Sequence, residues 1–177
     1  GAAYRSQTGV DQDGDITLKN IAPSLQPLFA GNRFRTHVDS SLDFPQVASL
    51  GFAYRPNPSL TFGLDVEWLG WSSFDEMFLD LHTEVPEAGL VDDFIDFDYN
   101  DVWQVKAGVD YKLNGSVSLR CGYTYSSKQV PASTLNPGNP DADQHGLSIG
   151  FGYRRGKATL DGFYTADFFQ TRRVEND

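Results

Sequence analysis

The stretch that decides the fold runs from Trp103 to Tyr125 and reads WQVKAGVDYKLNGSVSLRCGYTY. On either side of Asn114-Gly115, every second residue is apolar. This alternation places apolar side chains on one face of a β-strand and polar side chains on the other. An Asn-Gly pair between two such runs is a strong signal for a tight hairpin. The stretch therefore predicts two antiparallel strands, at 103–113 and 116–125.

Two more hairpins repeat this pattern. The first joins 48–54 to 60–68 through an Arg-Pro-Asn-Pro turn, and the second joins 147–153 to 160–168 through an Arg-Arg-Gly-Lys turn. Residues 1–7 have the pattern of the tail of one further strand. The sequence thus predicts an all-β, antiparallel fold with six full strands and a stub.

Long connections separate the hairpins, at 8–44, 72–100 and 127–144. Short and long connections therefore alternate strictly along the chain. A transmembrane β-barrel of the bacterial outer membrane shows this order, with short periplasmic turns and long outer loops. A soluble β-sandwich has the same alternation of side chains, so the period by itself leaves both folds open.

Two further features favour the membrane barrel. The polar face carries charges at mid-strand among Gly, Ser and Thr, as in a wet lumen, and aromatic residues gather near the strand ends. Lys106 and Arg120 are lumen cations that a ligand carboxylate could use, although pairing with Asp65 and Asp110 is the favoured role. The residues expected to face lipid are Leu50, Phe52, Leu64, Val105, Val109, Leu119, Ile149 and Leu160.

Composition restricts the class of protein further. The 177 residues carry a net charge of −10, so the chain does not attract nucleic-acid phosphates. Cys121 is the single cysteine, which excludes an internal disulfide. Six full strands and a stub are too few for a single-chain barrel, which needs about eight. The polar end at 174–177 adds no closing strand, so we expect residues 1–177 to form one partial barrel domain.

No motif indicates an enzyme, a cofactor or a metal site. The acidic run at 11–15 departs from the EF-hand pattern because its Gly precedes the third acid, which favours a solvated turn. The aspartates within 92–101 could bridge divalent cations, but a solvated loop is the favoured interpretation. His37, His82 and His145 lie far apart in the sequence and lack the paired spacing of zinc ligands.

The connection at 8–44 is strongly apolar between Ile21 and Phe29. One interpretation is a loop that packs on itself, and the other is an exposed groove that binds an apolar ligand. Leu25, Leu28 and Phe29 have spacings of three and four, which are compatible with one face of a short helix, although a proline inside the segment would strain it. The candidate ligand-binding residues are Ile21, Leu25, Leu28 and Phe29.

A series of short motifs resembles the FadL-type family of long-chain fatty acid transporters. The series begins with Tyr4-Arg5-Ser6, the long apolar loop and Phe44-Pro45. It continues through Trp68-x-x-Trp71-Ser72-x-Phe74, Leu119-Arg120-x-Gly122-Tyr123, Val130-Pro131, Pro140-Asp141, Gly150-x-Gly152-Tyr153 and Leu160-Asp161. The motifs occur in the family's order over essentially the whole chain.

The resemblance implies a fourteen-stranded barrel, of which this chain holds the end of strand seven through strand thirteen. The amino-terminal plug, the lateral wall opening, the first half and the last strand would lie outside it. Residues 8–44 would correspond to one of the two outer loops that form the initial capture groove.

The function implied is passive transport of long-chain fatty acids or other hydrophobic compounds across a Gram-negative outer membrane, without catalysis. The partners would be the apolar ligand and outer-membrane lipid, and the complete barrel would be a porin-like monomer. The alternative is a soluble β-sandwich module that binds a ligand such as carbohydrate. A third possibility is a barrel with a structural or adhesin-like role.

Overall fold

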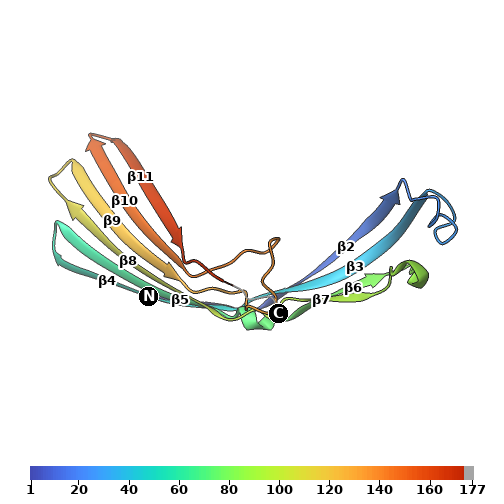
Figure 1. Cartoon of the computed structure of the whole chain (residues 1–177). Helices are drawn as coiled ribbons and strands as arrows, with labels where there is room; N and C mark the ends of the chain where they lie inside the picture. Colours follow the sequence, from blue (N-terminus) through green and yellow to red (C-terminus); the bar gives the residue numbers. More distant parts are fainter. Residues whose placement is uncertain (174–177) are drawn as a thin grey trace.

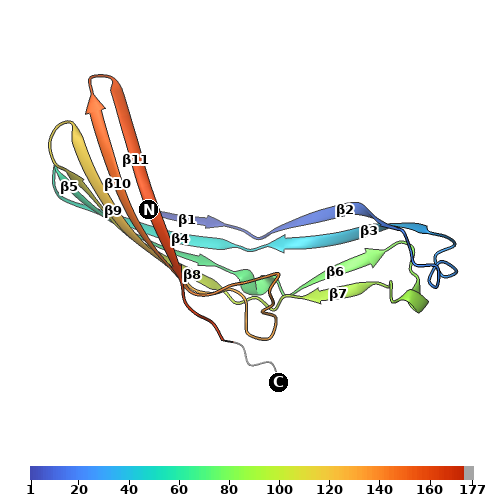
Figure 2. The ribbon, with the colours of Figure 1, turned by 45° about the horizontal axis from the view of Figure 1, so that its top comes forward.

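The computed structural model describes residues 1–173, and the polar end at 174–177 lies outside the described residues. The fold is all-β and has two antiparallel sheets, shown in Figures 1 and 2. The wall sheet contains β1 (Ala2–Arg5), β4 (Val47–Asn57), β5 (Leu60–Leu69), β8 (Val102–Lys112), β9 (Val117–Ser126), β10 (Gln144–Arg155) and β11 (Ala158–Phe169), in that order. The outer sheet contains β2 (Thr8–Lys19), β3 (Arg33–Phe44), β6 (Glu76–Leu81) and β7 (Asp93–Asp96).

The wall sheet confirms the three predicted hairpins and the stub. Every neighbouring pair of its strands is antiparallel, and the sheet curves as part of a barrel would (Figure 1). Within residues 1–173 the sheet is open, because β1 and β11 each pair on one side only. Two short 3₁₀ turns, η1 (Trp71–Ser73) and η2 (Pro86–Ala88), lie in the connections. No helix in this described part of the chain has the length and apolar character to span a membrane.

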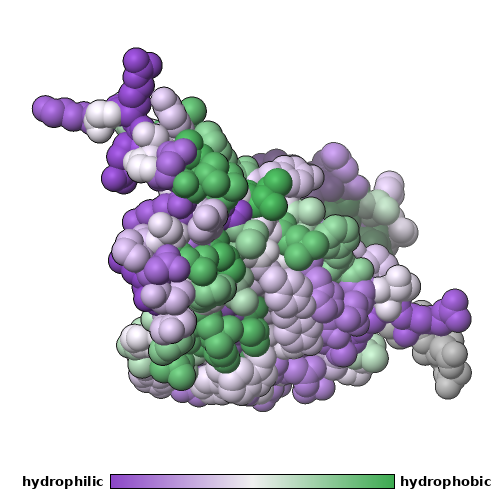
Figure 3. All heavy atoms as spheres, turned by 90° about the vertical axis from the view of Figure 1, so that its left-hand side faces the viewer, coloured by the Kyte–Doolittle hydropathy of each residue, from purple (hydrophilic) through white to green (hydrophobic). Residues whose placement is uncertain are grey.

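The strand register places the predicted apolar residues on one face of the wall. Leu64 lies opposite Phe52 on one side and Ala107 on the other, and Ile149 lies opposite Cys121 and Tyr164. Nothing in the described chain covers this face, and Leu50 is 64% exposed. Figure 3 shows apolar side chains gathered over the wall strands. An apolar surface of this extent requires an apolar solvent, which a membrane supplies.

The outer sheet is the main difference from the sequence-based expectation. Residues 8–44 are not an irregular loop but a hairpin of two 12-residue strands, β2 and β3. The acidic run expected to form a solvated turn lies within β2. Alternation does exist there, but Gln12 and Gly14 interrupt the apolar face and hide the period. The connection at 72–100 likewise contains β6 and β7.

The arrangement of the two sheets also decides against a sandwich. In a β-sandwich two sheets pack face to face over a common core. Here the outer sheet extends the wall end to end, because the chain passes directly from β1 to β2 and from β3 to β4 (Figure 2). The two sheets therefore do not enclose one core between them.

Asp101 joins the wall to the outer connections. Its carboxylate accepts hydrogen bonds from Trp68 Nε1 and from the backbone N–H of Ser72, both at 3.0 Å. Partial burial opposes ionisation, but the hydrogen bonds from Ser72 and Trp68 outweigh it and hold the pKa of Asp101 below its ordinary value. The ends of β5 and β8 are thus tied to the start of the 72–100 connection.

An aromatic cluster lies beside this tie. It consists of Trp71, Phe74, Phe97 and Tyr99, whose ring centroids are 4.8–6.0 Å apart. Asn139 Nδ2 donates to the Tyr99 hydroxyl at 2.8 Å, so the 127–144 connection is held against the cluster. These contacts hold the 72–100 and 127–144 connections together at the rim of the wall.

We expect an arginine to be tolerated on the two faces of the wall very differently. In the complete, membrane-folded protein, Val109→Arg or Leu119→Arg should cost about 2–4 kcal/mol in free energy of unfolding, because each places a charge in lipid. Ser118→Arg, on the polar face, should cost clearly less. Denaturant titration in lipid vesicles measures both, and equal costs on the two faces would contradict the assignment of the faces.

Asp101→Ala should lower the free energy of unfolding of the complete protein by about 1–3 kcal/mol at neutral pH, because two donors lose a charged acceptor. The pKa of Asp101 is lower in the folded state, so this contribution is complete above about pH 4 and lost as the pH falls through the folded pKa. Denaturant titration of the parent and the variant at several pH values would test this. A stability difference that does not change with pH would show that the ionised carboxylate is not responsible.

Candidate functional site

The polar face of the wall carries a line of paired charges. Arg120 donates from Nε to Asp110 at 2.7 Å and from Nη1 to Asp161 at 2.8 Å, which links β8, β9 and β11 across β10. Lys106 pairs with Glu67 at 3.1 Å. The expected partner Asp110 is therefore found for Arg120, whereas Lys106 takes Glu67 in place of Asp65. Both lumen cations already hold protein carboxylates.

Next to the Arg120 pairs, the polar face is hollowed by a row of small residues. Strand register aligns Gly63, Gly108 and Gly122 on three adjacent strands, and Ser148 and Thr165 continue the row on β10 and β11. We call this row the glycine trough. A cavity of about 590 Å³ lies over it. Because the glycines lack side chains, the backbone itself forms the floor.

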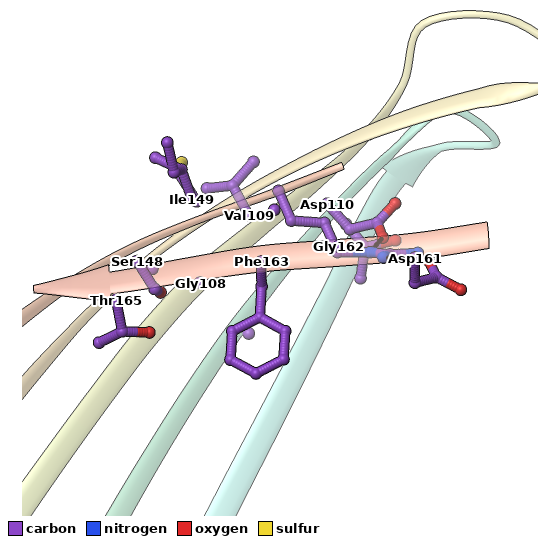
Figure 4. Close-up of a pocket in the computed structure, with 15 residues that line it drawn as sticks. Gly108, Val109, Asp110, Ser148, Ile149, Asp161, Gly162, Phe163 and Thr165 are labelled. Atoms are coloured by element: carbon purple, nitrogen blue, oxygen red, sulfur yellow. Dashed lines mark hydrogen bonds and ion pairs between the residues drawn. The ribbon is translucent and has the colours of Figure 1, made fainter. Parts of the chain in front are cut away.

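Phe163 is the one large apolar side chain among the residues that line the trough from the polar face (Figure 4). It lies between Asp161 and Thr165 on that face of β11, and the residue is 87% exposed in the described part of the chain. In Figure 4 Phe163 projects away from Val109 and Ile149, which point to the lipid side. The sequence did not point to Phe163, because one aromatic residue at a polar position of a strand only weakens the alternation.

The four candidate groove residues lie at the tip of the β2–β3 hairpin. The tip is a series of turns, not the short helix that the spacing suggested. Leu28 N–H donates to Leu25 O at 3.0 Å and Gln26 Nε2 to Ile21 O at 2.9 Å. Pro27 has no N–H, so it cannot extend a helical hydrogen-bond series. Ala30 ends the turns with a positive φ of 54°.

These residues differ in what they offer to a ligand. Leu25 and Leu28 are 45% and 38% exposed, and Ile21 is half-buried. Phe29 is 9% exposed and packs edge-on against Phe34 of β3, with ring centroids 5.2 Å apart. Phe29 therefore holds the tip to the outer sheet, and the two leucines are its accessible apolar surface.

One face of the outer sheet is acidic, and two histidines lie next to each other on it. His37 and His82 lie with ring centroids 5.0 Å apart because β3 pairs with β6, a long-range contact that sequence spacing does not reveal. His82 Nε2 lies 2.6 Å from Asp39. On the same face Arg35 donates to Asp15, and this hydrogen bond holds the pKa of the Asp15 carboxyl below its ordinary value.

Three of the five aspartates within 92–101, namely Asp92, Asp93 and Asp101, accept hydrogen bonds from backbone or ring N–H groups. Asp92 accepts from the N–H of Leu81 at 2.7 Å, and Asp101 accepts from Trp68 and Ser72. Across residues 1–173, no group of three or more His, Cys, Asp or Glu side chains is arranged to hold a metal ion.

Comparison with known proteins gives one family and several related structures. A family model described as outer membrane protein transport protein (OMPP1/FadL/TodX) matches residues 1–176. No curated protein matches the chain. A FadL homologue of Pseudomonas aeruginosa superposes with a TM-score of 0.81 at 24% identity, covering 96% of this chain and 40% of that one.

Two channels show the same fold at lower similarity. The CymD monoaromatic hydrocarbon channel has a TM-score of 0.62 at 19% identity and covers 96% of this chain and 42% of its own. The Pseudomonas putida toluene transporter TodX has a TM-score of 0.52 at 18% identity and covers 94% and 43%. The chain thus spans 40–43% of these structures, and identities this low relate the folds alone.

Proposed function

The chain belongs to the outer membrane protein transport family (OMPP1/FadL/TodX), and from this premise we propose that the complete protein carries long-chain fatty acids or other hydrophobic compounds passively across the bacterial outer membrane. The family consists of transport proteins of that membrane. The wall described here forms part of the barrel, with its apolar face in lipid and its polar face toward the lumen.

The observation that carries the proposal is the apolar tip of the outer hairpin. Leu25 and Leu28 remain exposed at the end of the outer sheet, beyond the part of the chain that faces lipid. Each CH₂ group that leaves water gains about 0.8 kcal/mol, so even a shallow apolar surface concentrates a hydrophobic compound. We infer that this tip is the site of first capture.

The wall favours apolar compounds beyond fatty acids as a second substrate class. Lys106 is paired with Glu67, and Arg120 with Asp110 and Asp161, so neither is an unneutralised cation that would attract the head group of a fatty acid. Related structures include channels whose descriptions name monoaromatic hydrocarbons. Uncharged hydrocarbons therefore fit the described face at least as well as fatty acids.

Replacing Leu25 and Leu28 together by Asp in the complete protein should weaken binding of an apolar ligand by about 1–3 kcal/mol, because the ligand loses two partly exposed apolar contacts. Phe29 stays unchanged, since its removal would loosen the tip itself. Barrel stability should hardly change. Binding of a radiolabelled fatty acid and of radiolabelled toluene, measured in detergent, tests both substrate classes.

The matched control is Val91→Asp. Val91 is an apolar residue of similar exposure in the 72–100 connection. It should leave binding unchanged. Full affinity in the double variant, with the barrel shown to be folded, would remove the tip from the capture step.

A further inference from the structure

We propose that the short-turn end of the wall binds the anionic head groups of membrane phospholipids, with Arg155 and Lys157 as the contacts that face lipid. This inference concerns the membrane partner of the wall and holds whichever compound the complete protein carries. Three features support it: a separation of charge along the chain, cations without carboxylate partners in the described residues, and tyrosines that place these cations at the membrane interface.

The three short turns of the wall lie at one end of the sheet, and their charged side chains are all positive (Figure 1). The segments around them, 54–60, 111–117 and 153–159, contain no Asp or Glu. They hold five of the 14 Lys and Arg residues of a chain that has 24 acidic residues. These five residues, which we call the basic end, are Arg55, Lys112, Arg154, Arg155 and Lys157. A gathering of cations in an acidic chain indicates an anionic partner at that end.

The described part of the chain provides no carboxylate partner for the basic end. Every ion pair among residues 1–173 involves a different cation. Within the same residues, Arg55 makes the one side-chain hydrogen bond of this group, from Nε to the Thr61 hydroxyl at 3.1 Å. Two turns are held by other groups, because Asn57 accepts from the N–H of Ser59 at 2.9 Å and Asn114 accepts from two backbone N–H groups. The charges are therefore not needed to shape these turns.

Aromatic residues place the basic end at the membrane interface. Tyr54, Tyr111 and Tyr153 lie on the lipid face at the ends of β4, β8 and β10, and each immediately precedes a cation of the basic end. Tyrosine gathers at the level where hydrocarbon meets the lipid head groups. The cations that follow these tyrosines therefore lie at the depth of the phosphates.

Arg155 and Lys157 are the members of the basic end that reach lipid. Arg155 lies two residues beyond Tyr153 and so on the same face of β10, and Lys157 lies in the two-residue turn before β11. Both residues are exposed. An acidic protein fits this position less well, because the two cations continue a face that is covered by lipid. Each cation near an anionic membrane surface strengthens binding about fivefold.

The test uses the complete protein in a neutral detergent, titrated with phosphatidylglycerol, which is anionic, or with phosphatidylcholine, which has no net charge. Native mass spectrometry counts the bound lipid molecules and gives the affinity for each lipid. The test variant combines Arg155→Gln with Lys157→Gln. The matched control combines Lys19→Gln with Arg33→Gln, because these two exposed cations lie opposite each other at the far end of the outer hairpin. Both variants change the net charge equally.

We expect the parent to prefer phosphatidylglycerol, and the test variant to bind this lipid about ten- to thirtyfold more weakly, because it lacks two cations. Affinity for phosphatidylcholine should not change. The control variant should keep the parent's affinity for both lipids. Denaturant titration in phosphatidylcholine vesicles should give the same unfolding midpoint for both variants and the parent.

Three outcomes would overturn the proposal. Equal affinities of the parent for the two lipids would show that the basic end does not select anionic head groups. An equal loss in the control variant would show that binding follows net charge alone. A lower unfolding midpoint of the test variant in phosphatidylcholine vesicles would show that carboxylates of the protein, in place of lipid, hold Arg155 and Lys157. None of these results bears on the proposed transport, which ligand binding tests separately.

Discussion

Every backbone N–H and C=O of a strand that crosses a membrane must be hydrogen-bonded to a neighbouring strand, because hydrocarbon offers no other partner. This constraint accounts for the antiparallel ladder that joins all seven wall strands. It also fixes the side chains, since a strand in a continuous ladder presents alternate residues to lipid and to the lumen. The two faces of β8 follow from this alone: Val105 and Val109 on one side, Lys106 and Asp110 on the other.

Different strands form the outer sheet, and a different constraint applies to them. In the outer sheet water can solvate an unpaired group, so strands may be short, and β3 pairs with β6 over only three residue pairs. Asp101 and the aromatic cluster of Trp71, Phe74, Phe97 and Tyr99 lie where the wall ends and the outer connections begin. The wall is thereby joined to an outer sheet whose tip exposes Leu25 and Leu28. The proposed function uses both the passage along the wall and the accessible apolar tip.

The local sequence pattern was sufficient to predict the strands of the wall but not those of the outer sheet. A two-residue Asn114-Gly115 turn would place Gly108 opposite Cys121, but three residues, Asn114 to Ser116, form the turn and place Gly108 opposite Gly122. That pairing follows from the alternation within one hairpin, because an odd number of turn residues keeps both apolar rows on one face. The position of Gly63 opposite Gly108 does not, because it depends on pairing across 45 residues of chain.

The proximity of His37 and His82 could not be predicted either, because it depends on the long-range pairing of β3 with β6. The β2 strand escaped notice because Gln12 and Gly14 break its apolar face. The candidate residues Ile21, Leu25, Leu28 and Phe29 were identified from composition, but only the packing of Phe29 on Phe34 separates the structural residue from the accessible ones.

The two-faced wall is the central claim, and a spin-label scan along β8 tests it most directly. Single labels placed from 103 to 111 in the complete protein, reconstituted in lipid bilayers, report access to oxygen from the lipid and to a nickel chelate from water. The account predicts strict alternation, with oxygen access highest at 103, 105, 107, 109 and 111 and chelate access highest at 104, 106, 108 and 110. Equal access at odd and even positions, or chelate access at the odd ones, would contradict it.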